Sequence, residues 1–267
     1  NYARNAAALN RLVSEKMLVV RASTGLHARH RTIADAVVKE VKPAQLEEFI
    51  TRMIRLYAAR AAGSRDTSDP NRRMMVHLIS HTRMRELRLN RTVVRRVYAG
   101  VQDLLSSDFH FWLQRGAYEV EYGELDLAES YLKSARACEG GERDHKVTTE
   151  WGFMSLRRAI ASPENDVYAR KAQEAISELI TVTRIAGANS PHAFSVLLQH
   201  GSEFARVSKE LSEVQRLKLA TDLRTVSGVA EAVCPESAEV RRAISNSRTT
   251  IDDILAMDIE PPARYPL

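Results

Sequence analysis

The sequence contains few of the residues that interrupt helices. Its 267 residues include 11 glycines and 8 prolines, and aromatic side chains account for only 6% of it. Scarce glycine and proline leave few sites for turns and loops. The dominant residues are alanine, leucine, arginine and glutamate, which lose little free energy on entering a helix. We therefore predict an all-α protein.

Cysteines and long apolar runs are also scarce. The two cysteines, Cys138 and Cys234, are too few for a disulfide framework and lack the spacing of a metal motif, so we expect each to be packed. No apolar run approaches the roughly 18 to 20 residues that span a bilayer, and no signal segment follows the basic start. We expect a cytoplasmic chain without a membrane partner. Because it begins at Asn1 and not at methionine, we interpret it as part of a longer protein.

Motifs that indicate catalysis are missing as well. The sequence has neither a G-x-x-x-x-G-K-[ST] phosphate loop nor a G-x-S-x-G nucleophile turn. His77 and His81 have the spacing of a zinc-binding helix, but Leu78 stands where a metalloprotease needs glutamate, and no third ligand is apparent. A polar helix edge is the favoured interpretation of this pair. We expect no enzymatic activity, no metal and no cofactor in this chain.

Charge is distributed unevenly. Residues 51–100 contain 12 arginines, no lysine and 3 acids, whereas residues 101–267 contain 19 basic and 26 acidic residues. Arginine makes bidentate contacts to phosphates and carboxylates that lysine cannot make. The basic part therefore either faces acidic groups of the same protein, which we favour, or binds nucleic acid.

Residues 1–42 carry a helix–hairpin–helix pattern. Apolar positions at helical spacing predict helices over 3–16 and 32–41. Between them, residues 17–22 and 26–30 predict two short strands around the turn Ser23-Thr24-Gly25. The pattern is typical of the end of a winged-helix fold, and equally of an ordinary hairpin between helices.

Helical periodicity dominates the rest of the chain. We expect helices over 43–62, 72–89 and 91–105, with a polar loop at 63–71. Further helices are expected over 109–122, 125–138, 145–160, 166–186, 192–206, 209–233 and 237–257, with Ser190 as a helix N-cap before Pro191. An α-solenoid is built from paired antiparallel helices that are joined by short loops.

One helical hairpin carries a specific pattern. Residues 109–142 place large, small and turn residues at the positions Trp112, Gly116, Gly123, Ala128, Leu132 and Ala135. Gly116 and Ala128 allow the two helices to approach closely, and Trp112 and Leu132 fill the space beside them. This stretch resembles a tetratricopeptide (TPR) repeat of about 34 residues. It departs from the family at Arg115, where leucine is preferred, and at Gly140-Gly141, which replace the usual proline.

Further repeats are weaker. The residues Trp151, Gly152, Ala172, Ile176 and Leu179 resemble a second unit, and residues 192–233 have room for a third. Because one repeat cannot bury its own faces, we predict an irregular solenoid of about three helix pairs. The expected organisation is a winged-helix-like segment (1–42), an arginine-rich helical domain (43–107), TPR-like repeats (108–258) and an extended tail (259–267).

A second resemblance lies upstream. The run from Gly25 to Ala34, GLHARHRTIA, is similar to a stretch of STAND-type NTPases, which are signal-transduction ATPases with numerous domains. In those proteins it leads from the nucleotide-binding region into helical repeats. The resemblance implies a sensor or scaffold arm of a larger signalling switch, often one that serves bacterial defence against phage. The family's nucleotide site does not carry over, because no position here matches its phosphate loop.

The resemblance to TPR proteins implies that a partner protein, or another domain of the same polypeptide, binds in a groove lined by first-helix side chains. We expect exposed partner-binding side chains at Arg115, Tyr118, Glu119 and Tyr122. An acidic strip near the repeat turn either receives a basic peptide or is a solvated face; it comprises Glu119, Glu121, Glu124, Asp126 and Glu129. Any oligomer would form through the parent protein.

The alternative function is nucleic-acid binding. Its candidate contacts are Arg29, Arg31, Arg72, Arg73, Arg83, Arg91, Arg95 and Arg96. His27 and His30 either contribute to such a phosphate contact or are packed and hydrogen-bonded. The arginines of residues 72–96 span more than one helical face, so they cannot all lie in one nucleic-acid groove.

Overall fold

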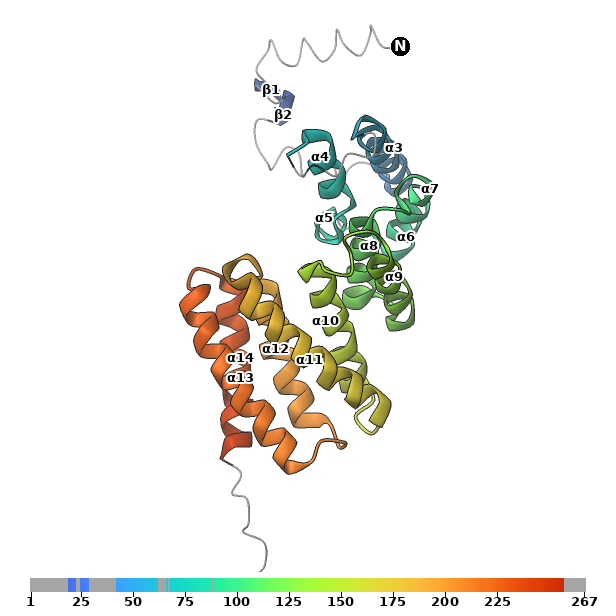
Figure 1. The fold of residues 1–267 in the computed structure, drawn as a ribbon. Coiled ribbons are helices and arrows are strands. Elements are labelled where there is room, and N and C mark those ends of the chain that lie inside the picture. The colour runs from blue at the N-terminus through green and yellow to red at the C-terminus, as the bar shows by residue number, and fades with distance from the viewer. Residues whose placement is uncertain are drawn as a thin grey trace, which may run out of the picture. The chain divides into compact units, whose positions relative to one another are not determined.

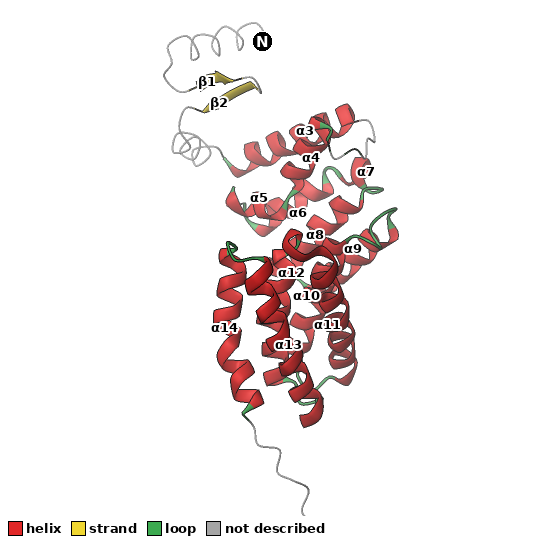
Figure 2. Cartoon of the chain, turned by 60° about the vertical axis from the view of Figure 1, so that its left-hand side comes forward, coloured by secondary structure: helices red, strands yellow, loops and turns green. Residues whose placement is uncertain are grey.

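The computed structural model describes residues 19–22, 25–28, 42–61, 66, 68–87 and 89–256, and it is predominantly helical (Figures 1 and 2). The all-α prediction is confirmed for these residues. The predicted helices 3–16 and 32–41 and the tail 259–267 lie outside the described part of the chain.

One antiparallel hairpin accompanies the helices. Strand β1 (Val19–Ala22) pairs with β2 (Gly25–Ala28), and Ala22 lies opposite Gly25 next to the turn. The hairpin predicted from the sequence is therefore confirmed. Its identity as the wing of a winged-helix fold stays a prediction, because both flanking helices lie outside the described residues.

The chain divides into two units, Asn1–Asp103 and Leu104–Leu267. In the first unit, α3 (Pro43–Ala61) packs against α4 (Pro70–Ile79) and α6 (Arg91–Ala99), and α5 (His81–Glu86) follows α4 directly. Apolar side chains such as Ile54, Ile79 and Val94 are fully buried there. The short helix α7 (Gln102–Leu105) spans the division.

Two predicted long helices are each interrupted. The helix predicted over 72–89 breaks at Ser80, which has an extended ψ of 129°, and the Ile79 carbonyl accepts a hydrogen bond from the buried hydroxyl of Tyr98 at 2.8 Å. The helix predicted over 91–105 stops at Gly100, whose carbonyl accepts from Nε and Nη2 of Arg55 at 2.9 and 2.7 Å. In both cases a side chain from a distant helix satisfies the carbonyl. The periodicity of apolar residues in the sequence does not reveal such a hydrogen-bond donor.

The second unit follows the sequence prediction closely. Its helices are α8 (Phe109–Tyr122), α9 (Leu125–Ala137), α10 (His145–Ala161), α11 (Asp166–Ala186), α12 (Pro191–Val207), α13 (Glu213–Val233) and α14 (Ala238–Leu255), with the 3₁₀ turn η1 (Gly187–Asn189) before α12. Side-chain caps fix several starts, including a full capping box at Ser212. Ser190 occupies the predicted N-cap position of α12, but its side chain makes no capping hydrogen bond.

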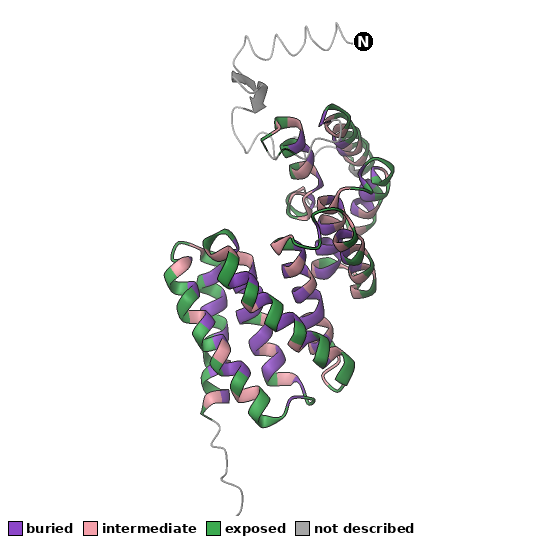
Figure 3. Cartoon of the chain, viewed as in Figure 1, coloured by how far each residue is buried: buried purple, intermediate pink, exposed green. Residues whose placement is uncertain are grey.

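Successive helices of the second unit form antiparallel hairpins that share one core. The pairs α8–α9, α10–α11 and α12–α13 pack internally, and α10 and α12 also contact each other. Helix α12 packs against α10, α11, α13 and α14, and it is largely buried in Figure 3. The outer faces of α13 and α14 are exposed in the same view. Buried apolar side chains from Leu113 of α8 to Ile254 of α14 belong to one connected core.

The same close contact recurs in all three hairpins. A glycine of the first helix lies under a leucine of the second, so that an added Cβ would stand 2.8 Å from Leu132 at Gly116, 2.7 Å from Leu179 at Gly152 and 3.2 Å from Leu223 at Gly201. The close approach at Gly116 agrees with the packing predicted from the sequence, and Gly152 and Leu179 belong to the stretch that resembles a second unit. The third contact was not recognised there.

Candidate interaction surface

Helix α8 carries the residues predicted to bind a partner. Tyr122 is 41% exposed and Arg115 is half-buried, with its guanidinium carbon 4.0 Å from the centre of the Tyr131 ring. This cation–π contact gives Arg115 a packing role within the α8–α9 hairpin. These two side chains remain candidates for a partner contact.

The expectation that Tyr118 and Glu119 are exposed is wrong. They are only 5% and 1% exposed, because residues 116–120 of α8 are buried on every side of the helix. The Glu119 carboxylate folds over the turn at Gly123 and accepts the backbone N–H of Glu124 at 3.0 Å. Glu119 therefore closes the α8–α9 turn.

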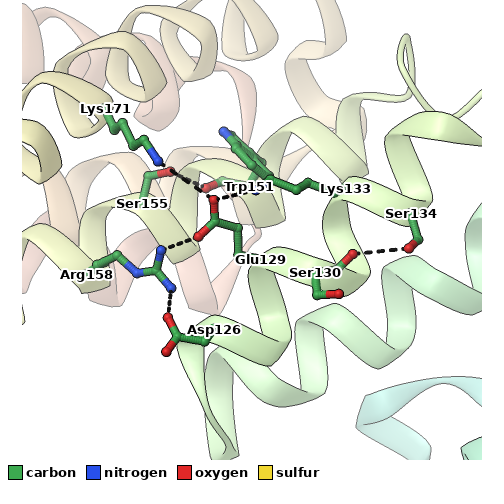
Figure 4. Close-up of polar contacts among 9 residues, drawn as sticks. All are labelled: Asp126, Glu129, Ser130, Lys133, Ser134, Trp151, Ser155, Arg158 and Lys171. Carbon is green, nitrogen blue, oxygen red and sulfur yellow. Dashed lines mark hydrogen bonds and ion pairs between the residues drawn. The ribbon is translucent and has the colours of Figure 1, made fainter.

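The predicted acidic strip is not uniformly solvated. Glu129 of α9 pairs with Arg158 of α10, with Lys133 at 3.0 Å and with Lys171 of α11 at 3.7 Å, and Asp126 pairs with Arg158 at 2.5 Å (Figure 4). The side chains of Glu129 and Arg158 are largely buried, whereas that of Asp126 is exposed. This cluster joins the first two hairpins.

The ionisation of Glu129 follows from these partners. Burial by itself raises the pKa of Glu129, but hydrogen bonds from Lys133 and Arg158 outweigh it and lower the pKa to about 2. The carboxylate is thus charged at neutral pH and committed to internal pairing. It is not available to a basic peptide.

The described arginines of the predicted nucleic-acid surface do not form one exposed stripe. Arg72 is only 8% exposed, whereas Arg73 is exposed. Arg96 makes a bidentate contact to Glu47 of α3, with its Nη2 2.7 Å from the carboxylate, and Arg83 pairs with Glu86 at 2.9 Å. Arg91 and Arg95 are half-buried, and Arg29 and Arg31 lie outside the described residues. Arginine in this unit therefore serves internal contacts at several positions.

A cluster of mainly polar side chains on α10, α12 and α14 was not predicted from the sequence. We call Glu150, Phe153, Arg157, His192, His200 and Glu239 the histidine cluster. Its centre is His192 at the start of α12, whose Nε2 lies 3.3 Å from Glu150 of α10 and whose Nδ1 lies 2.8 Å from Glu239 of α14. One imidazole thus links α10 and α12, the first helices of two successive hairpins, to α14, the last of the described helices.

The two histidines of this cluster have opposite ionisation. Burial alone lowers the pKa of His192, but hydrogen bonds to Glu150 and Glu239 outweigh it and raise the pKa to about 10. Burial, together with the charges of Arg157 and His192, lowers the pKa of His200 to about 4. His192 is therefore a cation at neutral pH, and His200 is neutral.

The cluster is held by apolar and backbone contacts. The ring of Phe153 lies 4.6 Å from that of His200 and meets that of His192 edge-on at 6.2 Å. Arg157 donates to the Val120 carbonyl of α8. Close to His200 in the sequence of α12, Gln199 is exposed and Glu203 is half-buried. No sequence spacing could reveal this cluster, because its members come from separate helices.

Among the described residues there is neither a metal-binding group nor a membrane-spanning helix. No group of three or more His, Cys, Asp or Glu there is arranged to hold a metal ion. His77 and His81 belong to two helices separated at Ser80, so they do not form the i, i+4 pair of a zinc helix. Across residues 42–61 and 68–256 as far as described, no helix is both long and apolar enough to cross a membrane.

Comparison of the whole sequence with protein-family models, with curated proteins and with solved structures found no significant match.

Proposed function

We propose that this chain is a non-catalytic interaction arm that binds a partner protein, or another domain of its parent polypeptide, along the first helices of an irregular TPR-like solenoid. The observation that carries the proposal is the recurrence of one glycine–leucine contact in three consecutive hairpins. Such recurrence is expected if each hairpin is a variant of one packing unit.

Contacts among α8, α10, α12 and α14, the last of the described helices, support the location of the binding surface. Contacts join α8 to α10, α10 to α12 and α12 to α14, so side chains from distant parts of the sequence line one series of helices. Tyr122, Arg157, His192 and Glu239 supply aromatic, cationic and anionic groups along it. Mixed charge beside aromatic rings is suited to recognising a peptide or a helix by both shape and charge.

The larger setting is part of the same proposal. The run from Gly25 to Ala34 resembles STAND-type NTPases, and in that family a repeat arm senses a signal for an ATPase encoded on the same chain. A cytoplasmic sensor arm of such a signalling protein, with a defence role against phage, fits the order of hairpin, arginine-rich helices and repeats. The sequence of the reading frame upstream of Asn1 tests this part, since a phosphate loop must be present there.

The experiment on the binding surface uses the full chain and a displayed library of random peptides. Peptides selected on the wild-type chain are tested against Tyr122→Ala and Gln199→Glu, which alter exposed positions of the first helices, and against Ser177→Glu and Thr225→Glu on the second helices α11 and α13. We expect the first pair to weaken binding about tenfold or more, on the scale of interface hot spots. The second pair should bind as the wild type does. If both pairs behave alike, the assigned surface is wrong.

Nucleic-acid binding is the runner-up. It needs a contiguous basic surface, but Arg72 is buried, and Arg83 and Arg96 pair with carboxylates of their own unit, so three of the candidate cations are not free for it.

A further inference from the structure

A cavity of about 440 Å³ lies between the end of α13 and the first two thirds of α14. Its volume falls within the roughly 300 to 1,000 Å³ of typical small-molecule sites. None of its lining residues is used in the proposed function, although Glu239 of the proposed surface directly precedes the lining residue Val240.

The floor of the cavity is apolar. Val240 and Ile244 lie one turn apart on α14, Cys234 follows α13 directly, and all three are buried. A floor of two aliphatic side chains and a thiol attracts an aliphatic chain through the hydrophobic effect.

The rim of the cavity is basic. Arg241 and Arg248 lie two turns apart along α14, and Glu231 of α13 is the one acid that lines this cavity. Arg248 pairs with Glu231 at 3.2 Å, with both side chains more than half exposed, whereas Arg241 donates from Nη1 to the Pro235 carbonyl at 2.9 Å. No carboxylate of the described residues pairs with Arg241. The rim thus has an excess of positive charge beside an apolar floor.

We propose that this cavity binds a small amphipathic anion, an aliphatic chain that ends in a carboxylate. The chain lies over Cys234, Val240 and Ile244, and the carboxylate pairs with the guanidinium of Arg241, which the Pro235 carbonyl holds at the rim. Guanidinium is the side-chain group best matched to a carboxylate, because it presents two parallel N–H donors. Arg248 adds positive charge once its weak, solvent-exposed pairing with Glu231 gives way.

The test is isothermal titration calorimetry of the full chain with sodium decanoate below its micelle concentration. Arg241→Gln should weaken binding about tenfold or more, the scale of losing a hydrogen bond to a charged group. Arg242→Gln is the matched control, because Arg242 is exposed on the same helix but does not line the cavity; it should change binding less than about twofold. Glu231→Gln should tighten binding by up to about fivefold, because it removes the competing carboxylate.

A blocking substitution, an uncharged ligand and protection of a cysteine test where the ligand binds. Ser245→Phe places a ring in the cavity from an exposed position on its wall and should abolish binding without unfolding the chain. Decanol, which lacks the charge, should bind at least about tenfold more weakly than decanoate. Bound decanoate should also slow alkylation of Cys234 by N-ethylmaleimide, with Cys138, the chain's other cysteine, as the internal reference.

Several results would contradict the proposed anion site. Absence of decanoate binding to the wild-type chain, equal losses in Arg241→Gln and Arg242→Gln, or binding that survives Ser245→Phe would each overturn the proposal. Decanol binding as tight as decanoate would overturn the role of the arginines. None of these results bears on the peptide-binding surface, which is tested separately.

Discussion

Glycine has two opposite roles inside the helices of the second unit. Gly116, Gly152 and Gly201 let a leucine of the next helix approach, whereas an added Cβ at Gly228 of α13 would meet no atom within 4 Å. A glycine without such a neighbour only lowers helix stability, by roughly 0.5–1 kcal/mol relative to alanine. The same residue type is therefore required at three positions and costly at a fourth.

This contrast predicts the effect of two substitutions. Gly116→Leu should destabilise the protein by about 3 kcal/mol, because its side chain must displace the fully buried Leu132. Gly228→Ala should instead stabilise it by up to about 1 kcal/mol. Chemical denaturation of both variants measures the difference. A Gly116→Leu variant as stable as the wild type would show that the register of the first hairpin is wrong.

Glu129 predicts a loss of stability in acid. Its folded-state pKa of about 2 lies below the ordinary value of 4.5, so the charged carboxylate stabilises the fold above pH 4.5, and this contribution disappears as the pH falls toward 2. Glu129→Gln should cost roughly 1–3 kcal/mol at pH 7, because it leaves the largely buried Arg158 with Asp126 as its one remaining carboxylate partner among the described residues. The cost should shrink between pH 4.5 and 2. Denaturation at a series of pH values tests this, and a cost that does not change with pH would contradict the assignment.

The histidine cluster predicts the opposite dependence at alkaline pH. Because the folded-state pKa of His192 is raised from 6.5 to about 10, its positive charge stabilises the fold fully below pH 6.5, and this contribution is lost as the pH rises to about 10. His192→Gln should therefore be most damaging below neutral pH and nearly harmless near pH 10. His200→Gln is the comparison: the folded-state pKa of His200 is lowered to about 4, so its contribution is present above 6.5 and lost toward pH 4. Melting temperatures of both variants from pH 4 to 10 should diverge in opposite directions.

At the scale of elements, a predicted helix end matches the structure where the residues that fix it are close in sequence. Helices α8 and α11 begin and end at the predicted residues, because local signals mark both: a capping Asp108 or Asn165 before them, and Gly123 or Gly187 after them. The helix predicted over 43–62 nearly matches α3, whereas those predicted over 72–89 and 91–105 extended too far. Their breaks at Ser80 and Gly100 depend on Tyr98 and Arg55, which lie far away in sequence.

The break between α4 and α5 predicts a specific cost. Tyr98→Phe removes the hydroxyl that donates to the Ile79 carbonyl and leaves that buried acceptor unsatisfied, which should cost about 1–3 kcal/mol. Tyr57→Phe on α3 is a suitable control, because Tyr57 is half-buried and donates to no carbonyl at a helix break among the described residues. Hydrogen exchange should show faster opening of α4 and α5 in Tyr98→Phe alone. Equal exchange in the two variants would mean that the hydroxyl does not stabilise the break.

At the scale of the whole molecule, helix content and hairpin order were accessible from the sequence because they depend on periodicity and turn residues. Which side chains lie on the surface could not be predicted from the sequence. Tyr118 and Glu119 were placed on the exposed side of α8 from a single-helix view, whereas neighbouring structure covers both. The histidine cluster needs three helices to be assembled before Glu150 and Glu239 can meet His192. Charge pairing across helices is a property of the fold and leaves no spacing in the sequence.

The distribution of arginine leads to the last prediction, which concerns the chain as a whole. Arg55, Arg83 and Arg96 are engaged by groups of their own unit, so the basic balance of residues 51–100 overstates the positive surface available to a nucleic acid. Binding to generic DNA or RNA should then be weak, with Kd roughly 10⁻⁴ to 10⁻⁶ M at physiological salt, and should fall steeply as salt rises, since it depends on counterion release alone. A sequence-specific receptor would instead keep a Kd of about 10⁻⁸ M or below. A salt titration with single- and double-stranded probes distinguishes the two. Tight binding that persists at about 0.2 M salt would replace the interaction-arm proposal with nucleic-acid recognition.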